Sequence, residues 1–319
     1  MTYTVKEEWL GKTVLDVLHK DLGLSHAAVK HLKFKENGIT VNGEHVTVRH
    51  IFSHGEVLSL ALEDTQTPEK LTPCQLALNI AYEDGELVVP DKPSDMPTHQ
   101  SFGHYGDTVA NALTYRYTEQ GLPFVFRPVN RLDRNTSGLL LIARNRMSAA
   151  FLSEAMKQGR IRKKYVAILR GVLPEDQGII RTYMRRTAES IIVRENCGEG
   201  EGGDLAVTEY TVMRRSDTHT LVCASPITGR THQLRVHFAG LGCPIEGDEL
   251  YGDGSELISR HALHSFMLTF PHPKGGEVTV TAPLHEDMLS LYGRVFGEDT
   301  QAVGEWGEYI FPKSKVQRN

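Results

Sequence analysis

Residues 127–145, RPVNRLDRNTSGLLLIARN, hold one carboxylate, that of Asp133, among several arginines. Nearby positive charge favours the ionised form of an acid, so we expect Asp133 to be ionised. The apolar run at 139–143 predicts a buried strand, which places the preceding Asn-Thr-Ser-Gly turn at the end of an element, facing a cleft. An ionised aspartate held there can serve as a nucleophile or a base, and a structural salt bridge is the alternative interpretation.

Charge is distributed unevenly along this chain of 319 residues, a length that predicts more than one domain. The formal net charge of −5 points, taken globally, to neither a nucleic acid nor a membrane as partner. Between residues 127 and 170, however, eleven Lys or Arg residues stand against two acids, Asp133 and Glu154. Such a local surplus is expected to attract a polyanion. A solvated helix face is the alternative.

Cysteine usage and the N-terminus indicate the compartment. The four cysteines lie far apart and include no CxxC pair, which favours reduced, mostly structural thiols in a cytosolic protein. The N-terminus has no cationic start followed by an apolar core, and no apolar run is long enough to span a bilayer. We therefore expect a cytoplasmic protein without membrane insertion.

Residues 1–62 predict a small α/β domain. Its expected elements are a helix at 10–22, a helix from the N-cap Ser25 to Asn37-Gly38, a hairpin of 39–41 and 46–48 around Asn42-Gly43, and a strand at 57–60. Residues 63–77, with two prolines and no periodicity, predict a linker that leaves this domain mobile.

Residues 78–298 form the predicted main domain, and residues 299–319 a peripheral C-terminal extension. The expected elements are strands at 80–82 and 87–89, a helix at 107–115 capped by Asp107, a helix at 148–158, and strands at 165–169 and 221–223. Residues 195–204 predict a flexible acidic loop. They satisfy GxGxxG formally, but Glu199 and Glu201 would repel a pyrophosphate, so no dinucleotide site is predicted.

A second charged cluster lies at 225–247, where Arg230, His232 and Arg235 follow the turn Thr228-Gly229. The pattern indicates an element that starts at a cleft and becomes buried. Five further histidines raise the question of a metal, but none has a zinc-ligand spacing, so no metal site is predicted. These five are His99, His104, His261, His264 and His272.

The first domain resembles the S4 RNA-binding domain. The shared features are Leu24-Ser25, the basic helix with Lys30, Lys33 and Lys35, Gly38, Val41-Asn42-Gly43 and Gly55-Glu56-Val57. The resemblance implies that Lys30 and Lys33 bind RNA. His26 replaces the usual arginine, and seven basic residues balance seven acidic ones in 1–62, so a weaker grip on phosphates is expected. A domain that only stabilises its neighbour is the alternative.

Residues 78–285 resemble the RluA family of RNA pseudouridine synthases. The motifs that carry the resemblance, in chain order, are NRLD at 130–133, TSGLL at 136–140, KY at 164–165, TGRTHQLRVH at 228–237, PIEGDELYG at 244–252, LH at 263–264 and HP at 272–273. The clearest departure is Asn130, where the family pattern has histidine. The resemblance implies an α+β fold, with a mixed, largely antiparallel sheet in the catalytic domain beside the small N-terminal α/β domain.

The resemblance also implies an activity, the isomerisation of specific uridines in structured RNA. Asp133 would be the catalytic nucleophile, Arg230 its ion-pair partner, and Tyr165 the aromatic ring against the target base. Extrusion of a stacked base leaves a gap that Arg131 could fill. Leu234 would form a wall of the pocket. The remaining residues assigned to substrate binding are Asn130, Thr136 and His232.

Several alternatives remain open at this point. A non-catalytic RNA-binding or ribosome-assembly factor on the same fold is one, although Asp133, Tyr165 and Arg230 are all present. A nucleoside glycosidase would need two carboxylates flanking the bond, and only one stands out. We expect ribosomal RNA as substrate, with transfer RNA as the alternative, no cofactor, and a monomer. The sequence does not decide between attack of Asp133 on the base and attack on the sugar.

Overall fold

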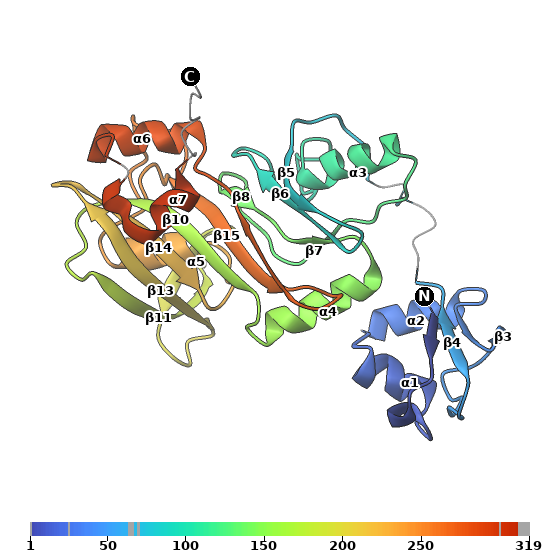
Figure 1. Cartoon of the computed structure of the whole chain (residues 1–319). Coiled ribbons are helices and arrows are strands. Elements are labelled where there is room, and N and C mark those ends of the chain that lie inside the picture. The colour runs from blue at the N-terminus through green and yellow to red at the C-terminus, as the bar shows by residue number, and fades with distance from the viewer. Residues whose placement is uncertain (1, 25, 63–66, 69–70, 300, 312–319) are drawn as a thin grey trace.

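The chain folds into two domains, each with its own sheet and hydrophobic core (Figure 1). The structure is a computed structural model and describes residues 2–24, 26–62, 67–68, 71–299 and 301–311. A four-stranded sheet forms the first domain and a twelve-stranded sheet the second. The predicted α+β class is confirmed. No helix within the described ranges is both long enough and apolar enough to cross a bilayer.

The N-terminal domain packs short helices against a sheet of strand order β1-β4-β2-β3. Its elements are β1 (Thr2–Thr4), η1 (Glu7–Trp9), α1 (Val14–Asp16), η2 (Val17–Asp21), α2 (His26–Phe34), β2 (Ile39–Val41), β3 (Glu44–His45) and β4 (Val57–Leu60). The predicted hairpin turn at Asn42-Gly43 is confirmed, and both residues adopt the positive φ that such a turn requires. The second strand was wrong in its position, because it is β3 at Glu44–His45 and not residues 46–48. The predicted cap Ser25 lies outside the described residues.

The helix predicted at 10–22 was wrong in its extent. Gly11 has a φ of 73°, which no α-helix contains, and the chain enters α1 only after Thr13. The Thr13 hydroxyl accepts the Asp16 N–H and so caps the helix. The apolar spacing was nevertheless correct, since Val14, Val17 and Leu18 are fully buried.

The N-terminal domain contacts the second domain through α4 (Arg146–Lys157). Met147 and Ala150 of α4 pack against the first domain's core, which is built around Trp9, Leu18 and Leu58. Figure 1 shows α4 as the element of the main domain that faces the N-terminal domain. The domain is therefore seated on α4, whereas the predicted linker implied a mobile tether.

The main sheet is almost wholly antiparallel and runs in the order β12-β11-β13-β14-β10-β15-β8-β6-β9-β7, with β5 on β6 and β16 on β15. Among the described strands, β8 and β15 form the parallel pair. The strands are β5 (Asn79–Glu83), β6 (Leu87–Lys92), β7 (Arg127–Pro128), β8 (Ser137–Leu139), β9 (Ile142–Ala143), β10 (Arg162–Arg170), β11 (Gln177–Arg186), β12 (Arg194–Cys197), β13 (Asp204–Arg215), β14 (His219–Pro226), β15 (Leu263–Pro271) and β16 (Glu277–Thr281).

Helices and short turns surround this sheet. They are α3 (Val109–Glu119), α4, α5 (Gln233–Gly240), α6 (Glu286–Phe296), η3 (Gln301–Trp306) and α7 (Gly307–Ile310). The cap of α3 is Thr108, one residue after the predicted Asp107, and its hydroxyl accepts the Asn111 N–H. Asn145 caps α4 in the same way.

The segment that carries Asp133 is held between β7 and β8. The strand predicted at 139–143 is divided into β8 and β9, but all of its residues are fully buried, as an apolar run predicts. Thr98 fixes the other end of the segment, because its hydroxyl donates to the Leu132 carbonyl and accepts the Leu132 N–H. The Thr136 N–H closes the turn on the Asp133 carbonyl. The backbone around Asp133 is therefore fixed on both sides.

Two predictions about loops were wrong. The acidic segment 195–204 contains β12, which pairs with β11 over four residue pairs. The C-terminal extension is not peripheral, because Val303 and Ile310 are buried in the main core and the Leu284 N–H donates to the Ile310 carbonyl. Within the described residues, the main domain therefore extends to residue 311.

Candidate active site

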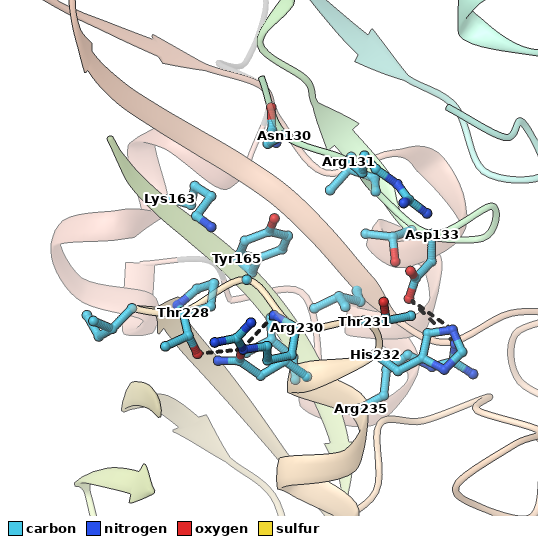
Figure 2. A pocket seen from close by; sticks show the side chains of 18 of the residues that line it. Asn130, Arg131, Asp133, Lys163, Tyr165, Thr228, Arg230, Thr231, His232 and Arg235 are labelled. Carbon is cyan, nitrogen blue, oxygen red and sulfur yellow. Dashed lines mark hydrogen bonds and ion pairs between the residues drawn. The ribbon is translucent and has the colours of Figure 1, made fainter. Parts of the chain in front are cut away.

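A cavity of about 640 Å³ opens beside Asp133 (Figure 2). Most of its lining comes from residues 129–136 before β8, the start of β10, and residues 226–235 from the end of β14 into α5; the end of α4 and Leu263 of β15 complete it. The predicted site residues that it brings together are Asn130, Arg131, Asp133, Thr136, Tyr165, Arg230, His232 and Leu234. Lys30 and Lys33 lie apart from it, exposed on α2 of the N-terminal domain.

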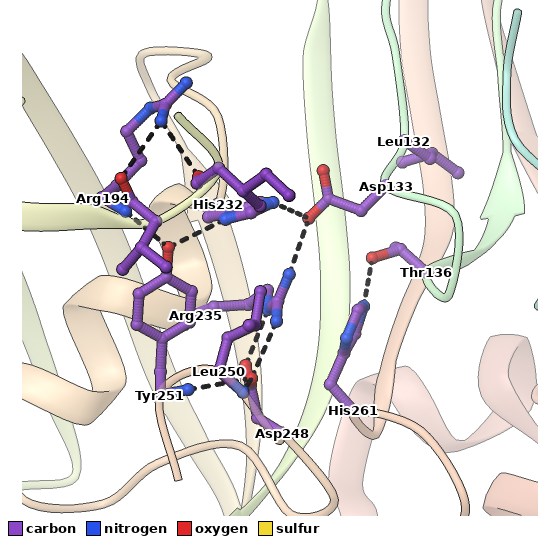
Figure 3. A network of polar contacts seen from close by, with 12 residues as sticks. Leu132, Asp133, Thr136, Arg194, His232, Arg235, Asp248, Leu250, Tyr251 and His261 are labelled. Atoms are coloured by element: carbon purple, nitrogen blue, oxygen red, sulfur yellow. Dashed lines mark hydrogen bonds and ion pairs between the residues drawn. The ribbon is translucent and has the colours of Figure 1, made fainter. Parts of the chain in front are cut away.

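Asp133 presents one free oxygen to this cavity. Its Oδ2 lies 3.6 Å from Arg235 Nη1 and 3.8 Å from His232 Nε2 (Figure 3). Oδ1 makes no hydrogen bond with any residue in the described ranges. A carboxylate held by one oxygen keeps a fixed orientation, while the lone pairs of the other oxygen are available to an incoming atom.

The predicted ion pair between Asp133 and Arg230 was wrong. Arg230 lines the same cavity, but its guanidinium points to β13, where Nε donates to the Leu205 carbonyl at 3.0 Å and Nη1 lies 3.4 Å from Asp204. The reason is position along the chain: Arg230 precedes α5, whereas Arg235 lies within it. Residues three apart share a helix face, so His232 at the N-cap and Arg235 reach the same carboxylate.

Arg235 is itself held rigidly by Asp248. Its Nε and Nη2 donate to the two Asp248 carboxylate oxygens at 2.7 and 2.8 Å, a bidentate pair in which both side chains are buried. Burial would raise the pKa of Asp248, but the hydrogen bonds and charge of Arg235 outweigh it and lower that pKa below its ordinary value. Arg235 is thus a fixed cation between a structural aspartate and Asp133.

Tyr165 lines the cavity from β10 and belongs to the main core, with 7% of its surface exposed. Burial raises the pKa of its phenol, and the Asp133 charge raises it further, so the hydroxyl stays protonated at neutral pH. Leu234 of α5 is buried and forms an apolar part of the wall, as predicted. A flat ring and an aliphatic wall suit a planar base.

Asn130 and Thr136 make structural hydrogen bonds at the edge of the cavity. The Asn130 Oδ1 accepts the Leu141 N–H at 2.7 Å, so this residue ties the Asp133 segment to the strands behind it. Its Nδ2 is buried without a hydrogen-bond partner among the described residues. The Thr136 hydroxyl contacts His261 Nε2 at 2.8 Å.

The sequence did not reveal the role of Lys92, which lies fully buried behind the Asp133 turn. Its Nζ donates to the carbonyls of Pro93 and Arg134, both at 2.8 Å, and so fixes the residue that follows Asp133. Burial, together with the charge of Arg260, lowers the pKa of Lys92 to about 7. A lysine at the end of a buried strand, after Leu87-Val88-Val89, was the signal that could have found it.

The lowered pKa of Lys92 predicts a pH-dependent stability. Between pH 7 and the ordinary lysine pKa near 10, the unfolded chain holds more protons on this amine than the folded protein does. The free energy of unfolding should therefore rise with pH, by about 2 kcal/mol between pH 7 and 9. Urea titrations at both pH values should show this rise in the natural protein and its loss in Lys92→Met. An equal rise in both would contradict the assignment.

One group of side chains has the composition of a metal site. Asp91, His264 and His285 place their ligand atoms within 4.8 Å of one another. These atoms are already engaged, because His285 Nε2 lies 3.0 Å from Asp91, His264 Nε2 contacts the Ala282 carbonyl and His264 Nδ1 contacts Ser137. A ring nitrogen that donates to a carbonyl carries a proton and cannot bind a metal. The group is a hydrogen-bond network centred on the buried His264.

Comparisons with known proteins agree with this geometry. Residues 86–240 match the family described as RNA pseudouridylate synthase. The chain is 36% identical to YjbO of Bacillus subtilis, named an uncharacterized RNA pseudouridine synthase, over 85% of its own length and 95% of that protein. It is 33% identical to ribosomal large subunit pseudouridine synthase D of Vibrio cholerae, over 91% of its length and 93% of that protein. The solved structure of human RNA pseudouridylate synthase domain containing 1 aligns with a TM-score of 0.55 and 32% identity, over 65% of this chain and 84% of that one.

The fold and the relatives define the class: an enzyme that isomerises a nucleotide within RNA. The chain belongs to the RNA pseudouridylate synthase family, and its resemblance to the RluA-type members is confirmed.

Proposed function

We propose that this enzyme converts specific uridines of large-subunit ribosomal RNA to pseudouridine, with Asp133 as the catalytic nucleophile. The observation that carries the role of Asp133 is its geometry. One carboxylate oxygen is held by Arg235 and His232, and the other is free beside a cavity lined by Tyr165 and Leu234. Ribosomal RNA as substrate is supported by the name of the Vibrio cholerae relative.

The reaction breaks the bond from C1′ to N1, turns the uracil and joins C1′ to C5; C5 then loses its proton, and N1 takes one up. Atoms and electrons balance without an oxidant or a reductant. A carboxylate can attack C1′ or the base and later leave, and the fixed cation Arg235, 3.6 Å from Asp133 Oδ2, orients the carboxylate for this step. The protonated hydroxyl of Tyr165 can exchange a proton with the sugar or with C5.

RNA must also deliver an unstacked base to the cavity. Arg131 is exposed at the rim, two residues from Asp133, where it can enter the stack that the extruded base leaves. Lys157 and Lys163 line the same cavity, so part of the basic stretch lies where the phosphates of an entering strand would pass. These contacts position the RNA and carry no sequence information themselves.

The experiment that tests this function maps pseudouridine at single-base resolution in total RNA from cells with and without the gene. Loss of one or a few ribosomal sites, restored by the natural gene and not by Asp133→Ala, is the expected result. Loss confined to transfer RNA would correct the substrate. A purified protein that binds RNA and forms no pseudouridine in any RNA would favour the assembly-factor interpretation.

The N-terminal domain is proposed to add phosphate contacts through α2. Lys30 and Lys33 are exposed, so Lys30→Ala combined with Lys33→Ala should weaken RNA binding several-fold. It should also lower the slope of log affinity against log salt by roughly 1.5. The matched control is Lys20→Ala, whose lysine lies in the same domain and pairs with Asp16 at 2.8 Å. Equal slopes for the natural protein and the double variant would show that the domain does not grip RNA through these lysines.

A further inference from the structure

His232 has a backbone conformation that is rare for its residue type. Its φ of 59° and ψ of 17° lie in the left-handed region, and it occupies the N-cap position of α5 without capping the helix by its side chain. Non-glycine residues in this region cost of order 1–3 kcal/mol and persist where surrounding contacts fix them. The contacts of the His232 ring should therefore show which interactions hold the residue in this conformation.

Tyr251 makes the contact that fixes the ring. Its hydroxyl lies 2.8 Å from His232 Nδ1 and 2.9 Å from the backbone nitrogen of Arg194 (Figure 3). A backbone N–H can only donate, so the phenol oxygen accepts the hydrogen bond of Arg194, and its own O–H is left to donate to Nδ1, which we take as the direction of that bond. A neutral imidazole that accepts at Nδ1 carries its proton at Nε2. That nitrogen is the one 3.8 Å from Asp133 Oδ2.

The surroundings of His232, burial above all, favour its neutral ring. Burial lowers the pKa of His232; Asp133 and Asp248 act in the opposite sense, and Arg235 and Arg194 act in the same sense as burial. The hydroxyl proton that Tyr251 aims at Nδ1 opposes protonation there as well. Asp133 therefore faces one full positive charge, on Arg235, and one neutral N–H.

We propose that Tyr251 is a positioning residue, which fixes His232 in the Nε2–H tautomer and so aligns the Asp133 carboxylate for attack. The proposal rests on the proposed role of Asp133. A protonated His232 would add a second cation to the same oxygen and bind the carboxylate more strongly, which lowers its nucleophilicity. The other tautomer would turn a lone pair toward a negative oxygen and repel it. Tyr251 excludes both states.

The position of Tyr251 is set from two directions. Its backbone N–H donates to Asp248 Oδ1, the acid that also binds Arg235. Its ring lies 5.0 Å from the Arg235 guanidinium, and its hydroxyl is held by the N–H of Arg194, the first residue of β12. The β11–β12 extension of the sheet is thereby connected to Asp133 through two side chains, Tyr251 and His232.

The test removes the hydroxyl alone, in Tyr251→Phe. We expect kcat to fall roughly ten- to a hundred-fold, because orienting partners of catalytic groups have effects of this size, while KM changes by less than about twofold. Without the donor at Nδ1 the pKa of His232 rises, so the acidic limb of the kcat profile should move to higher pH by about one unit. Tyr183→Phe is the matched control, since that hydroxyl binds Glu199 in the same extension, away from the ring of His232.

Two further measurements separate positioning from general damage. Two-bond proton–nitrogen NMR spectra of the free protein should show His232 as the Nε2–H tautomer. The resonance of His232 is assigned by its absence in the variant His232→Asn; asparagine is chosen because it tolerates positive φ. Tyr251→Phe combined with His232→Asn should be no slower than His232→Asn alone, because both changes remove the same Tyr251–His232 interaction. An Nδ1–H tautomer in the natural protein, or additive losses in the double variant, would overturn the proposal.

The NMR result also stands apart from the proposed function. If Asp133→Asn proved active, the role of Asp133 would fall while the tautomer of His232 could still be correct. If Asp133→Asn is inactive and Tyr251→Phe keeps full activity with an unshifted pH profile, the role of Asp133 stands and the positioning role of Tyr251 is wrong.

Discussion

Asp133→Asn should lower turnover by at least about a thousand-fold, because loss of a covalent nucleophile removes the reaction path itself. The amide has nearly the shape of the carboxylate, so the turn that Thr136 and Lys92 hold should persist. RNA affinity should then stay within a few-fold of the natural value. The measurement is single-turnover pseudouridine formation, with binding measured on the same RNA.

The control for this variant is Asp204→Asn. Asp204 is also an acid paired with an arginine near the cavity, but it is exposed and its partner is Arg230. Removing its charge should change turnover by less than about threefold, since exposed pairs contribute little. Comparable losses in both variants would mean that charge near the cavity matters in general and that Asp133 has no special role. Full activity of Asp133→Asn would refute the proposal that Asp133 is the nucleophile.

The sequence placed the Asp133 segment beside a cleft, where the structure has a cavity, because the signals there are local. A carboxylate among arginines, a small-residue turn and an apolar run identify Asp133 at a cavity wall without knowledge of the rest of the fold. Periodicity likewise found the buried face of the first helical region. It did not find where that region begins, because the left-handed Gly11 and the cap Thr13 decide this and periodicity is insensitive to both.

The predictions from sequence that were wrong concern contacts between segments that are distant in sequence. Two arginines stand in one motif, and only the path of the chain decides that Arg235 reaches Asp133 while Arg230 reaches Asp204. The burial of Ile310 depends in the same way on a core assembled by residues far upstream. Tyr251 and Lys92 acquire their roles through hydrogen bonds to His232 and the Arg134 carbonyl, which no local pattern contains.

Arg235→Met should be the most destabilising change at the site. It leaves the Asp248 carboxylate, whose side chain is 0% exposed, without its bidentate partner. Removing one member of a buried ion pair costs about 3–5 kcal/mol, which in a chain of this size lowers the melting temperature of the main domain by roughly 6 to 20 °C. Arg230→Met, which breaks an exposed pair, should cost less than about 1 kcal/mol. Thermal unfolding of the two variants side by side tests this contrast.

A second change separates stability from catalysis at Arg235. Adding Asp248→Asn to Arg235→Met removes the orphaned charge, while an amide oxygen can still accept the N–H groups of Leu250 and Tyr251. Much of the lost stability should therefore return. Turnover should not return, because Asp133 would still lack the cation that orients its carboxylate. If activity recovered together with stability, Arg235 would be a structural residue only, and the free oxygen of Asp133 would need no fixed cation beside it.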